Sequence, residues 1–206
     1  MTGTAERNQF PADTALLLVD IQNDFCPGGS LAVPEGDHVV TVANKLIPRF
    51  KFAVATQDWH PANHISFKAR GGPWPPHCVQ GTFGAEIHPG VDTKRVEAFV
   101  RKAFTPDQDA YSEFEGKTSD GLTLDEVLSR RGIRTIYLTG LATDYCVKAT
   151  ALDGLKKGYT VYVVTDGIRA VEVNPGDGAK ATADMAAAGA HLVTSEQILG
   201  KAQATP

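Results

Sequence analysis

Asp20, Lys102 and Cys146 have side chains of complementary chemistry, and each lies just beyond an apolar, β-branched run of the sequence. Cys146 falls in the stretch GLATDYCVKAT, where Thr143 or Asp144 would make a suitable helix N-cap, so the cysteine is expected in the first turn of a helix. The partial positive charge of a helix start favours a thiolate, and a nearby ammonium favours it further. With Lys102 as that ammonium and Asp20 as acceptor of the thiol proton, the three residues predict nucleophilic catalysis by a cysteine.

Each of these residues also has a plainer interpretation. A cysteine is often a small buried hydrophobe, a lysine is usually a solvated charge, and an aspartate commonly belongs to a turn. The plainer interpretation is preferable for any one of them taken alone. Their shared position after strand-like runs favours the catalytic interpretation for the set.

A second group of residues has the composition of a metal site. Asp58 and His60 are two positions apart, which puts both side chains on one face of an extended segment, and His77 follows a Pro-Pro pair. One carboxylate and two imidazoles suit one divalent metal ion, with zinc the first choice and iron or manganese as alternatives. His64 is either a further ligand or a residue that orients the ligands. The alternative is that these side chains only bond to loop backbone.

Aromatic residues are concentrated near both groups. Phe25 follows Asp20 closely, Trp74 precedes the third predicted metal ligand, and Tyr111 and Phe114 lie in the loop after Lys102. Core packing is the ordinary role of such side chains. Beside a candidate active site, they also favour a flat slot for an aromatic substrate.

The elements that must position these residues alternate between strand and helix. Apolar runs without alternation predict strands buried on both faces, at 15–19, 52–56, 96–100, 135–139, 160–165 and 191–194. Helical patterns lie between several of them, at 39–50, 122–132, 143–158 and 174–190. The alternation predicts an α/β fold, doubly wound, with a mainly parallel six-stranded sheet and helices on both faces. In such a sheet ligands bind beyond the carboxyl ends of the strands, and the predicted catalytic and metal residues follow strands at that rim.

Composition places limits on the class of protein. The chain has 206 residues, 42% hydrophobic and 21% charged, which suits one domain over 1–206 with short mobile ends before residue 13 and after Gly200. The net charge of −4 gives no reason to expect nucleic acid or an anionic membrane as partner, and no apolar run spans a bilayer. Three cysteines and no secretory signal predict a reducing cytoplasm. A homo-oligomer is compatible with these numbers.

Known nucleotide and serine-hydrolase motifs are absent from the sequence. The turn after the first predicted strand reads DIQNDF and contains no G-x-G-x-x-G, and no G-x-x-x-x-G-K-[ST] occurs anywhere. There is no G-x-S-x-G either. A nucleotide-binding module and a serine nucleophile at a strand-to-helix elbow are therefore not supported.

Six segments together resemble the nicotinamidase/pyrazinamidase family of isochorismatase-like cysteine hydrolases. They occur in the family's order from about residue 14 to 196: VDIQNDFCPGGSLAV, TQDWHPANHISF, WPPHCVQGT, RKAF, YSEFEG and GLATDYCVKATALDG. The resemblance implies the isochorismatase-like hydrolase fold. It also implies hydrolysis of nicotinamide, and of its analogue pyrazinamide, to nicotinate or pyrazinoate plus ammonia in NAD salvage.

The resemblance assigns roles to residues that match the family's motifs. The catalytic triad is Asp20, Lys102 and Cys146, and the metal ligands are Asp58, His60 and His77. A cis peptide between Leu141 and Ala142 is implied, aiming the N–H groups of Ala142 and Cys146 at one oxyanion. The residues implied to contact the substrate are Phe25 and Trp74, which sandwich its ring, with Tyr111 and Leu141.

Two other functions fit parts of the pattern. Another isochorismatase-like amidase would act on a ureido or maleamate-type substrate, but the carboxylate of such a substrate calls for an arginine where this chain offers an aromatic slot. A non-enzymatic module binding a metal or ligand would not need the complete Asp/Lys/Cys set. Release of ammonia from nicotinamide distinguishes the three functions.

Overall fold

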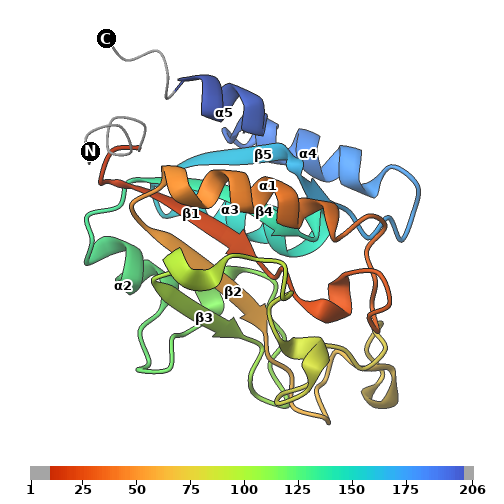
Figure 1. Cartoon of the computed structure of the whole chain (residues 1–206). Helices are drawn as coiled ribbons and strands as arrows, with labels where there is room; N and C mark the ends of the chain where they lie inside the picture. The colour runs from red at the N-terminus through yellow and green to blue at the C-terminus, as the bar shows by residue number, and fades with distance from the viewer. Residues whose placement is uncertain (1–9, 202–206) are drawn as a thin grey trace.

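A six-stranded sheet runs through the computed structural model, which describes residues 10–201 (Figure 1). All its neighbouring strands are parallel, in the order β3-β2-β1-β4-β5-β6. The six predicted apolar runs all form strands of this sheet, so the predicted fold class is confirmed. The strand bounds are β1 Thr14–Val19, β2 Ala53–Asp58, β3 Ala98–Lys102, β4 Thr135–Leu141, β5 Thr160–Arg169 and β6 His191–Val193.

The strand order places a topological switch beside β1. The chain adds β2 and β3 on one side of β1, and then crosses to build β4, β5 and β6 on the other side. Ligand sites of doubly wound sheets lie beyond the carboxyl ends of the strands at such a point. In Figure 1 the arrowheads of β1, β2 and β3 point toward the same group of loops.

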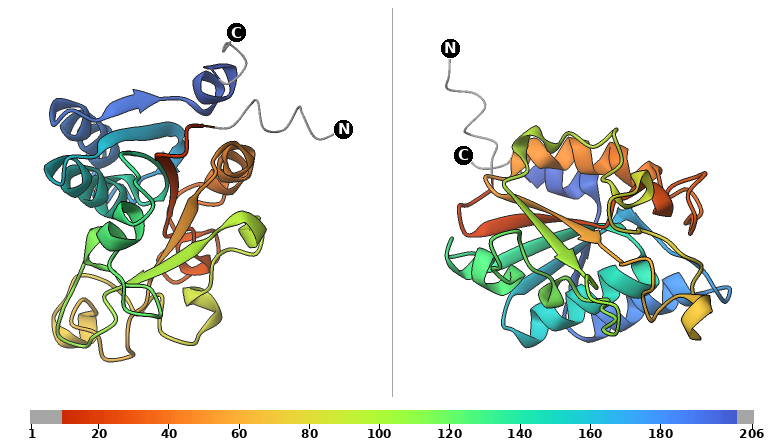
Figure 2. Two further views of the ribbon diagram at one scale, coloured as in Figure 1. Left: turned by 90° about the vertical axis from the view of Figure 1, so that its left-hand side faces the viewer. Right: turned by 90° about the horizontal axis from the view of Figure 1, so that it is seen from below.

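Helices cover both faces of the sheet, each closing its own hydrophobic core. α1 (His38–Leu46) and α5 (Ser195–Lys201) lie on one face. α2 (Leu124–Ser129), α3 (Lys148–Lys156) and α4 (Asp177–Ala187) lie on the other, as the left view of Figure 2 shows. The predicted helical patterns correspond to α1 to α4, whereas α5 was not expected.

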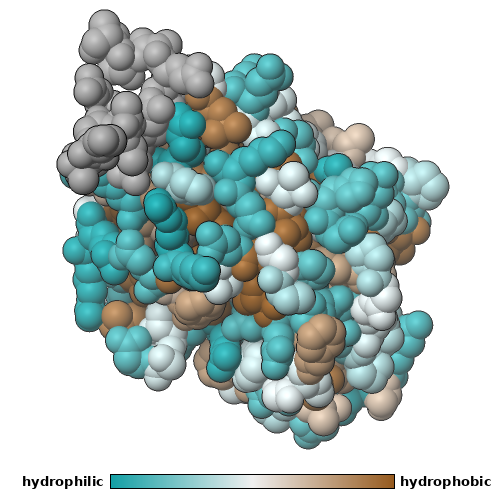
Figure 3. Space-filling view, viewed as in Figure 1, coloured by the Kyte–Doolittle hydropathy of each residue, from teal (hydrophilic) through white to brown (hydrophobic). Residues whose placement is uncertain are grey.

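The prediction that the strands are buried on both faces is correct for the centre of the sheet and wrong for its edges. Every residue of β1 and β2 is buried, but β3 and β6 each expose side chains, including Phe99 at 41% and Leu192 at 40%. An edge strand has a neighbour on one side only, so part of its surface stays open. The face seen in Figure 3 is mainly hydrophilic, with apolar side chains visible in hollows between the polar ones.

The region from Trp59 to Gly90 is a long loop, as predicted from its lack of periodicity. It contains two short 3-10 turns, η4 (Lys68–Arg70) and η5 (Phe83–Ala85), and otherwise irregular backbone. Most of the predicted mobile ends lie outside the described residues. Among residues 10–201, none of the helices is both long and apolar enough to cross a membrane.

Candidate active site

Three predicted residues lie side by side because three adjacent strands end at one rim. Asp20 follows β1, Asp58 ends β2, and Lys102 ends β3 in register with Asp58. The Lys102 ammonium is fully buried, pairs with Asp20 Oδ2, and lies 2.7 Å from Asp58 Oδ1. Burial alone would lower the pKa of Lys102, but the Asp20 and Asp58 carboxylates hold it well above its usual value. The lysine is therefore a fixed positive charge between the two aspartates.

Asp20 is held in place by Thr56 as well as by Lys102. Its backbone N–H donates to Thr56 Oγ1 at 3.1 Å, and the Thr56 hydroxyl donates to Asp20 Oδ1 at 2.9 Å. Burial raises the pKa of Asp20, an effect that Lys102 opposes and the nearby Asp58 reinforces. A carboxylate with a raised pKa is a stronger base, which suits a group that must take a proton from a thiol.

Cys146 faces this cluster from the turn that follows β4. A carboxylate oxygen of Asp20, one of Asp58 and the Cys146 Sγ all lie within 4.8 Å of one another. Burial raises the pKa of Cys146 well above its usual value, and Asp20 and Asp58 add to this while Lys102 opposes it. The thiolate expected from the helix start stays a prediction, which Lys102 favours and burial opposes. A neutral thiol needs a base to remove its proton before it can attack.

The predicted N-cap before Cys146, Thr143 or Asp144, is wrong. The helix begins with a π-helical turn, η8 (Thr143–Val147), whose N-cap is Ala142 and which leads into α3. The Asp144 carboxylate instead accepts hydrogen bonds from the backbone N–H groups of Val171 and Glu172, at 2.9 and 3.0 Å. It thus ties the cysteine turn to the loop after β5.

The backbone before Cys146 has the expected geometry. The Leu141–Ala142 peptide is cis, which confirms that prediction. Gly140 has a φ of 127°, and a Cβ there would collide with the backbone of Val19 on β1. The N–H groups of Tyr145 and Val147 both donate to the Ala142 carbonyl at 3.1 Å, so the turn is closed directly after the cis bond.

The predicted metal ligands converge at the same rim. His60 Nε2 lies 3.5 Å and His77 Nε2 4.0 Å from Asp58 Oδ2, and the three ligand atoms fall within 4.8 Å of one another. Burial alone would raise the pKa of Asp58, but Lys102, His60 and His77 hold it below its usual value. Asp58 therefore offers one oxygen to Lys102 and the other to the imidazoles.

The surroundings of these ligands fit a divalent cation. His77 Nδ1 donates to the Pro75 carbonyl at 2.8 Å, so the lone pair of Nε2 is free to bind a metal ion. Burial lowers the pKa of this imidazole, which favours the neutral form that a metal ion requires. The Gln22 side chain holds the backbone of Asp58 in place. It accepts a hydrogen bond from the Asp58 N–H at 2.9 Å and donates one to the Asp58 carbonyl at 2.8 Å. His64 has a hydrogen-bond partner at each ring nitrogen, Ser66 Oγ at 2.7 Å and the Gln108 carbonyl at 3.0 Å, and its ring lies 4.2 Å from that of His60.

Aromatic side chains form part of the site's wall. Trp74 Nε1 donates to the Tyr111 hydroxyl at 3.0 Å, and Tyr145 packs against both rings, with centroids 5.0 Å from Trp74 and 5.6 Å from Tyr111. Phe25 contacts the His77 ring at 5.6 Å. Tyr145, the residue before Cys146 in the chain, thus lies with the two rings beside the site.

The comparisons with known proteins agree with this geometry. A family model described as the isochorismatase domain matches residues 14–197. The chain belongs to the isochorismatase family. It is 47% identical over 200 residues to the nicotinamidase of Escherichia coli (strain K12), covering 87% of this chain and 94% of that one.

Solved structures of similar isochorismatase-family proteins cover the same range. PnC1 from L. infantum in complex with nicotinate superposes with a TM-score of 0.84 at 39% identity, over 91% of this chain and 96% of that one. The pyrazinamidase of Pyrococcus horikoshii in complex with zinc has a TM-score of 0.81 at 46% identity, over 88% and 99%. The predicted family is thereby confirmed.

Sequence reasoning missed one residue of the site in this isochorismatase-family chain. Glu113, in the 3-10 turn η7 (Glu113–Glu115), is fully buried with Oε1 3.1 Å from Lys102 Nζ. The segment YSEFEG appears polar, but Ser112 and Phe114 on either side are both buried. The signal that the sequence offered is the aromatic residue Phe114 next to this acid, in the loop after the predicted catalytic lysine.

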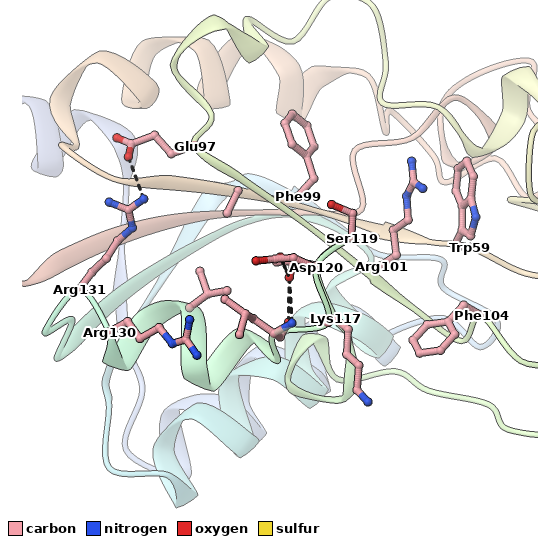
Figure 4. A pocket seen from close by; sticks show the side chains of 15 residues that line it. Trp59, Glu97, Phe99, Arg101, Phe104, Lys117, Ser119, Asp120, Arg130 and Arg131 are labelled. Atoms are coloured by element: carbon pink, nitrogen blue, oxygen red, sulfur yellow. Dashed lines mark hydrogen bonds and ion pairs between the residues drawn. The ribbon is translucent and has the colours of Figure 1, made fainter.

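A groove of about 970 Å³ lies elsewhere, along the exposed edge strand β3 (Figure 4). Arg101 stacks over Trp59 at 3.7 Å at one end, and Arg131 pairs with Glu97 at 3.2 Å at the other. None of the predicted catalytic or metal residues lines it. In this isochorismatase-family protein the candidate site is located by the metal-ligand side chains and by the buried charges around Lys102, and not by the volume of this groove.

Proposed function

We propose that the protein is a nicotinamidase that hydrolyses nicotinamide to nicotinate and ammonia, with Cys146 as nucleophile. The observation that carries the proposal is the convergence of Asp20, Lys102 and Cys146 beside an Asp/His/His ligand set. This arrangement occurs in a chain 47% identical to a nicotinamidase and similar in structure to a protein solved with nicotinate. Pyrazinamide, the diazine analogue, is proposed as a second substrate, because a similar structure is that of a pyrazinamidase.

The chemistry follows from the positions of the side chains. Asp20 takes the proton of Cys146, and the sulfur attacks the carboxamide carbon while Lys102 balances the negative charge. The oxyanion forms against the N–H groups of Ala142 and Cys146, a type of stabilisation worth about 10²–10³ in rate for each donor. Asp20 returns the proton to the nitrogen as the C–N bond breaks, and ammonia leaves a thioester on Cys146. Water deprotonated by Asp20 then hydrolyses the thioester and releases nicotinate.

Asp58, His60 and His77 are proposed to hold one divalent ion. Zinc is favoured because the similar pyrazinamidase structure contains zinc, and two neutral imidazoles with a carboxylate suit it. When bound, the ion would act as a Lewis acid toward a ring nitrogen or water at the rim. The carboxylate of Asp58 also contacts Lys102, so the protein itself links the ligand set to the catalytic cluster.

The product and the cysteines support a proposal for the cellular setting of the protein. A role in NAD salvage follows from the product, nicotinate. The cysteines of the described chain, Cys26, Cys78 and Cys146, are all free and buried, which supports a reducing compartment such as the cytoplasm. A single domain and a small-molecule substrate suffice for the activity, with a homo-oligomer as a further proposal.

A substrate panel tests the proposed activity. Nicotinamide and pyrazinamide should both release ammonia, whereas an acyclic ureido acid should react at least about 100-fold more slowly, because the wall of the site is aromatic. Trp74→Ala should raise KM for both ring substrates by about tenfold, since it removes stacking area and the hydrogen bond to Tyr111. Phe83→Ala, at a 68% exposed aromatic, is the matched control and should leave KM unchanged. Faster cleavage of the ureido acid than of nicotinamide would refute the substrate assignment.

Metal content tests the ligand set. Elemental analysis should find about one divalent ion per chain, and His60→Ala should lose it together with most of the turnover. Acid should release the ion, because the imidazoles must be neutral to bind it. His38→Ala, at an exposed histidine on α1, is the control and should keep the ion. A metal-free protein with full activity would contradict the proposed role.

A further inference from the structure

Glu113 is a buried carboxyl group that the proposed mechanism does not use. It is fully buried, and neither of its oxygens has a hydrogen-bond donor with suitable geometry, although Oε1 lies 3.1 Å from Lys102 Nζ. A buried polar group without a hydrogen bond is costly and calls for an explanation. The position next to the catalytic lysine indicates that the explanation concerns the reaction.

The fold holds Glu113 firmly at this position. Ser112 and Glu115 form a capping box around the η7 turn, and the Glu113 N–H donates to Thr150 Oγ1 on α3 at 3.1 Å. Phe114 is buried beside α2 and α3 and anchors the turn. The carboxyl group therefore cannot swing out to solvent without dismantling these contacts.

Lys102 is shared by the buried carboxyl groups of Asp20 and Glu113, whereas Asp58 also belongs to the proposed metal ligand set. One ammonium compensates only one of these two negative charges. A buried carboxylate that is left uncompensated is strongly unfavourable, and the group then holds a proton instead. Glu113 is the acid best placed to hold it, because Asp20 receives hydrogen bonds from Thr56 and Lys102, and Asp58 receives one from Lys102.

We propose that Glu113 is a positioning residue that stays protonated and donates its O–H to Asp20, fixing the base and Lys102 in their working geometry. One proton on the Glu113 carboxyl gives this group a hydrogen bond that it otherwise lacks, and gives Asp20 a further donor. The proton stays on Glu113 during turnover, while the one that moves is the Cys146 proton, which passes to Asp20 and on to ammonia. The inference rests on the proposed amidase activity.

The electrostatics of the site agree with a neutral Glu113. Burial raises the pKa of Glu113 well above its usual value, Asp20 raises it further, and Lys102 opposes the shift. The titratable groups that face this carboxyl are Asp20 after β1, Asp58 on β2, Lys102 on β3 and Cys146 in η8. Burial and the adjacent Asp20 carboxylate therefore both favour the neutral acid, and the Glu113 and Asp20 side chains lie close enough to share a hydrogen bond.

Two substitutions of similar size separate a hydrogen-bond donor from a space filler. Glu113→Leu fills the site without a donor, so kcat for nicotinamide should fall about tenfold or more with KM within about twofold. Loss of a donor to the ionised Asp20 carboxylate should raise the pKa of Asp20. In this variant the acid limb of kcat should therefore lie at higher pH than in the wild type. Glu113→Gln keeps a donor and cannot ionise, so it should restore at least about a third of kcat with the acid limb in place. Glu196→Gln, at an exposed glutamate on α5, is the control and should keep the wild-type kcat and acid limb.

The outcomes separate this inference from the proposed function. A wild-type protein that releases no ammonia from nicotinamide would refute the amidase and the inference together. With an active wild type, a Gln variant as impaired as the Leu variant, or a fully active Leu variant, would overturn the inference alone. If circular dichroism shows that Glu113→Leu does not fold, the Gln profile decides. If the acid limb of Glu113→Gln stays at the wild-type pH, Glu113 is neutral in the wild type, which supports the inference. If the acid limb moves to lower pH, the substitution has removed a negative charge, and the inference is overturned.

Discussion

Replacing Cys146 by alanine is expected to abolish ammonia release from nicotinamide, with kcat falling by about 10⁴-fold or more. The sulfur is the side-chain nucleophile of the proposed mechanism, and it lies within 4.8 Å of the Asp20 carboxylate that would activate it. The change removes one buried sulfur atom from a packed site, so the fold should survive. Steady-state ammonia release and far-UV circular dichroism of the purified variant check both expectations.

Cys26→Ala is the matched control for this substitution. Cys26 is also a buried free cysteine, and burial together with Asp37 raises its pKa to about 11, which makes it a poor nucleophile. This variant should keep wild-type turnover. Acid-quenched wild type should also show a nicotinoyl mass increment on the peptide that contains Cys146. Turnover retained in Cys146→Ala, or an acyl group on another residue, would rule out the proposed covalent step.

The fold could be predicted because its signals are local. Apolar runs such as ALLLV mark central parallel strands, and in a parallel sheet the residues after such strands must meet at one rim. The sequence alone therefore predicts that Asp20, Asp58 and Lys102 lie together. The edge strands were misjudged because exposure depends on which neighbour a strand lacks, and that follows from strand order rather than from strand composition.

The parts of the site that escaped prediction depend on contacts between distant segments. Asp144 resembles an N-cap in sequence, but its carboxylate is taken by backbone N–H groups some 27 residues away. The burial of Cys146 among Asp20 and Asp58, which opposes a thiolate, is likewise not visible in the sequence. Glu113 was overlooked because only the approach of η7 to Lys102 turns a polar loop residue into a buried acid.

Asp20→Asn is expected to lower kcat by about 10²–10⁴, the range for loss of a general base. Asparagine has the same shape and can still accept from Thr56, but it cannot take the Cys146 proton. The thiol would then keep its proton, because burial raises its pKa. Single-turnover and steady-state rates with nicotinamide measure the loss. Asp125→Asn is the control, since Asp125 is likewise paired with a lysine, Lys157 at 3.3 Å, but at the surface.

The pH dependence gives this prediction a second readout with a definite sign. The base acts only when ionised, so wild-type kcat/KM should fall as pH drops through the pKa of Asp20, which burial raises above its ordinary value. The residual activity of Asp20→Asn should lack that acid limb, because no carboxylate titrates at this position. A loss of less than about threefold, or an acid limb that persists unchanged in the variant, would assign the base to another residue.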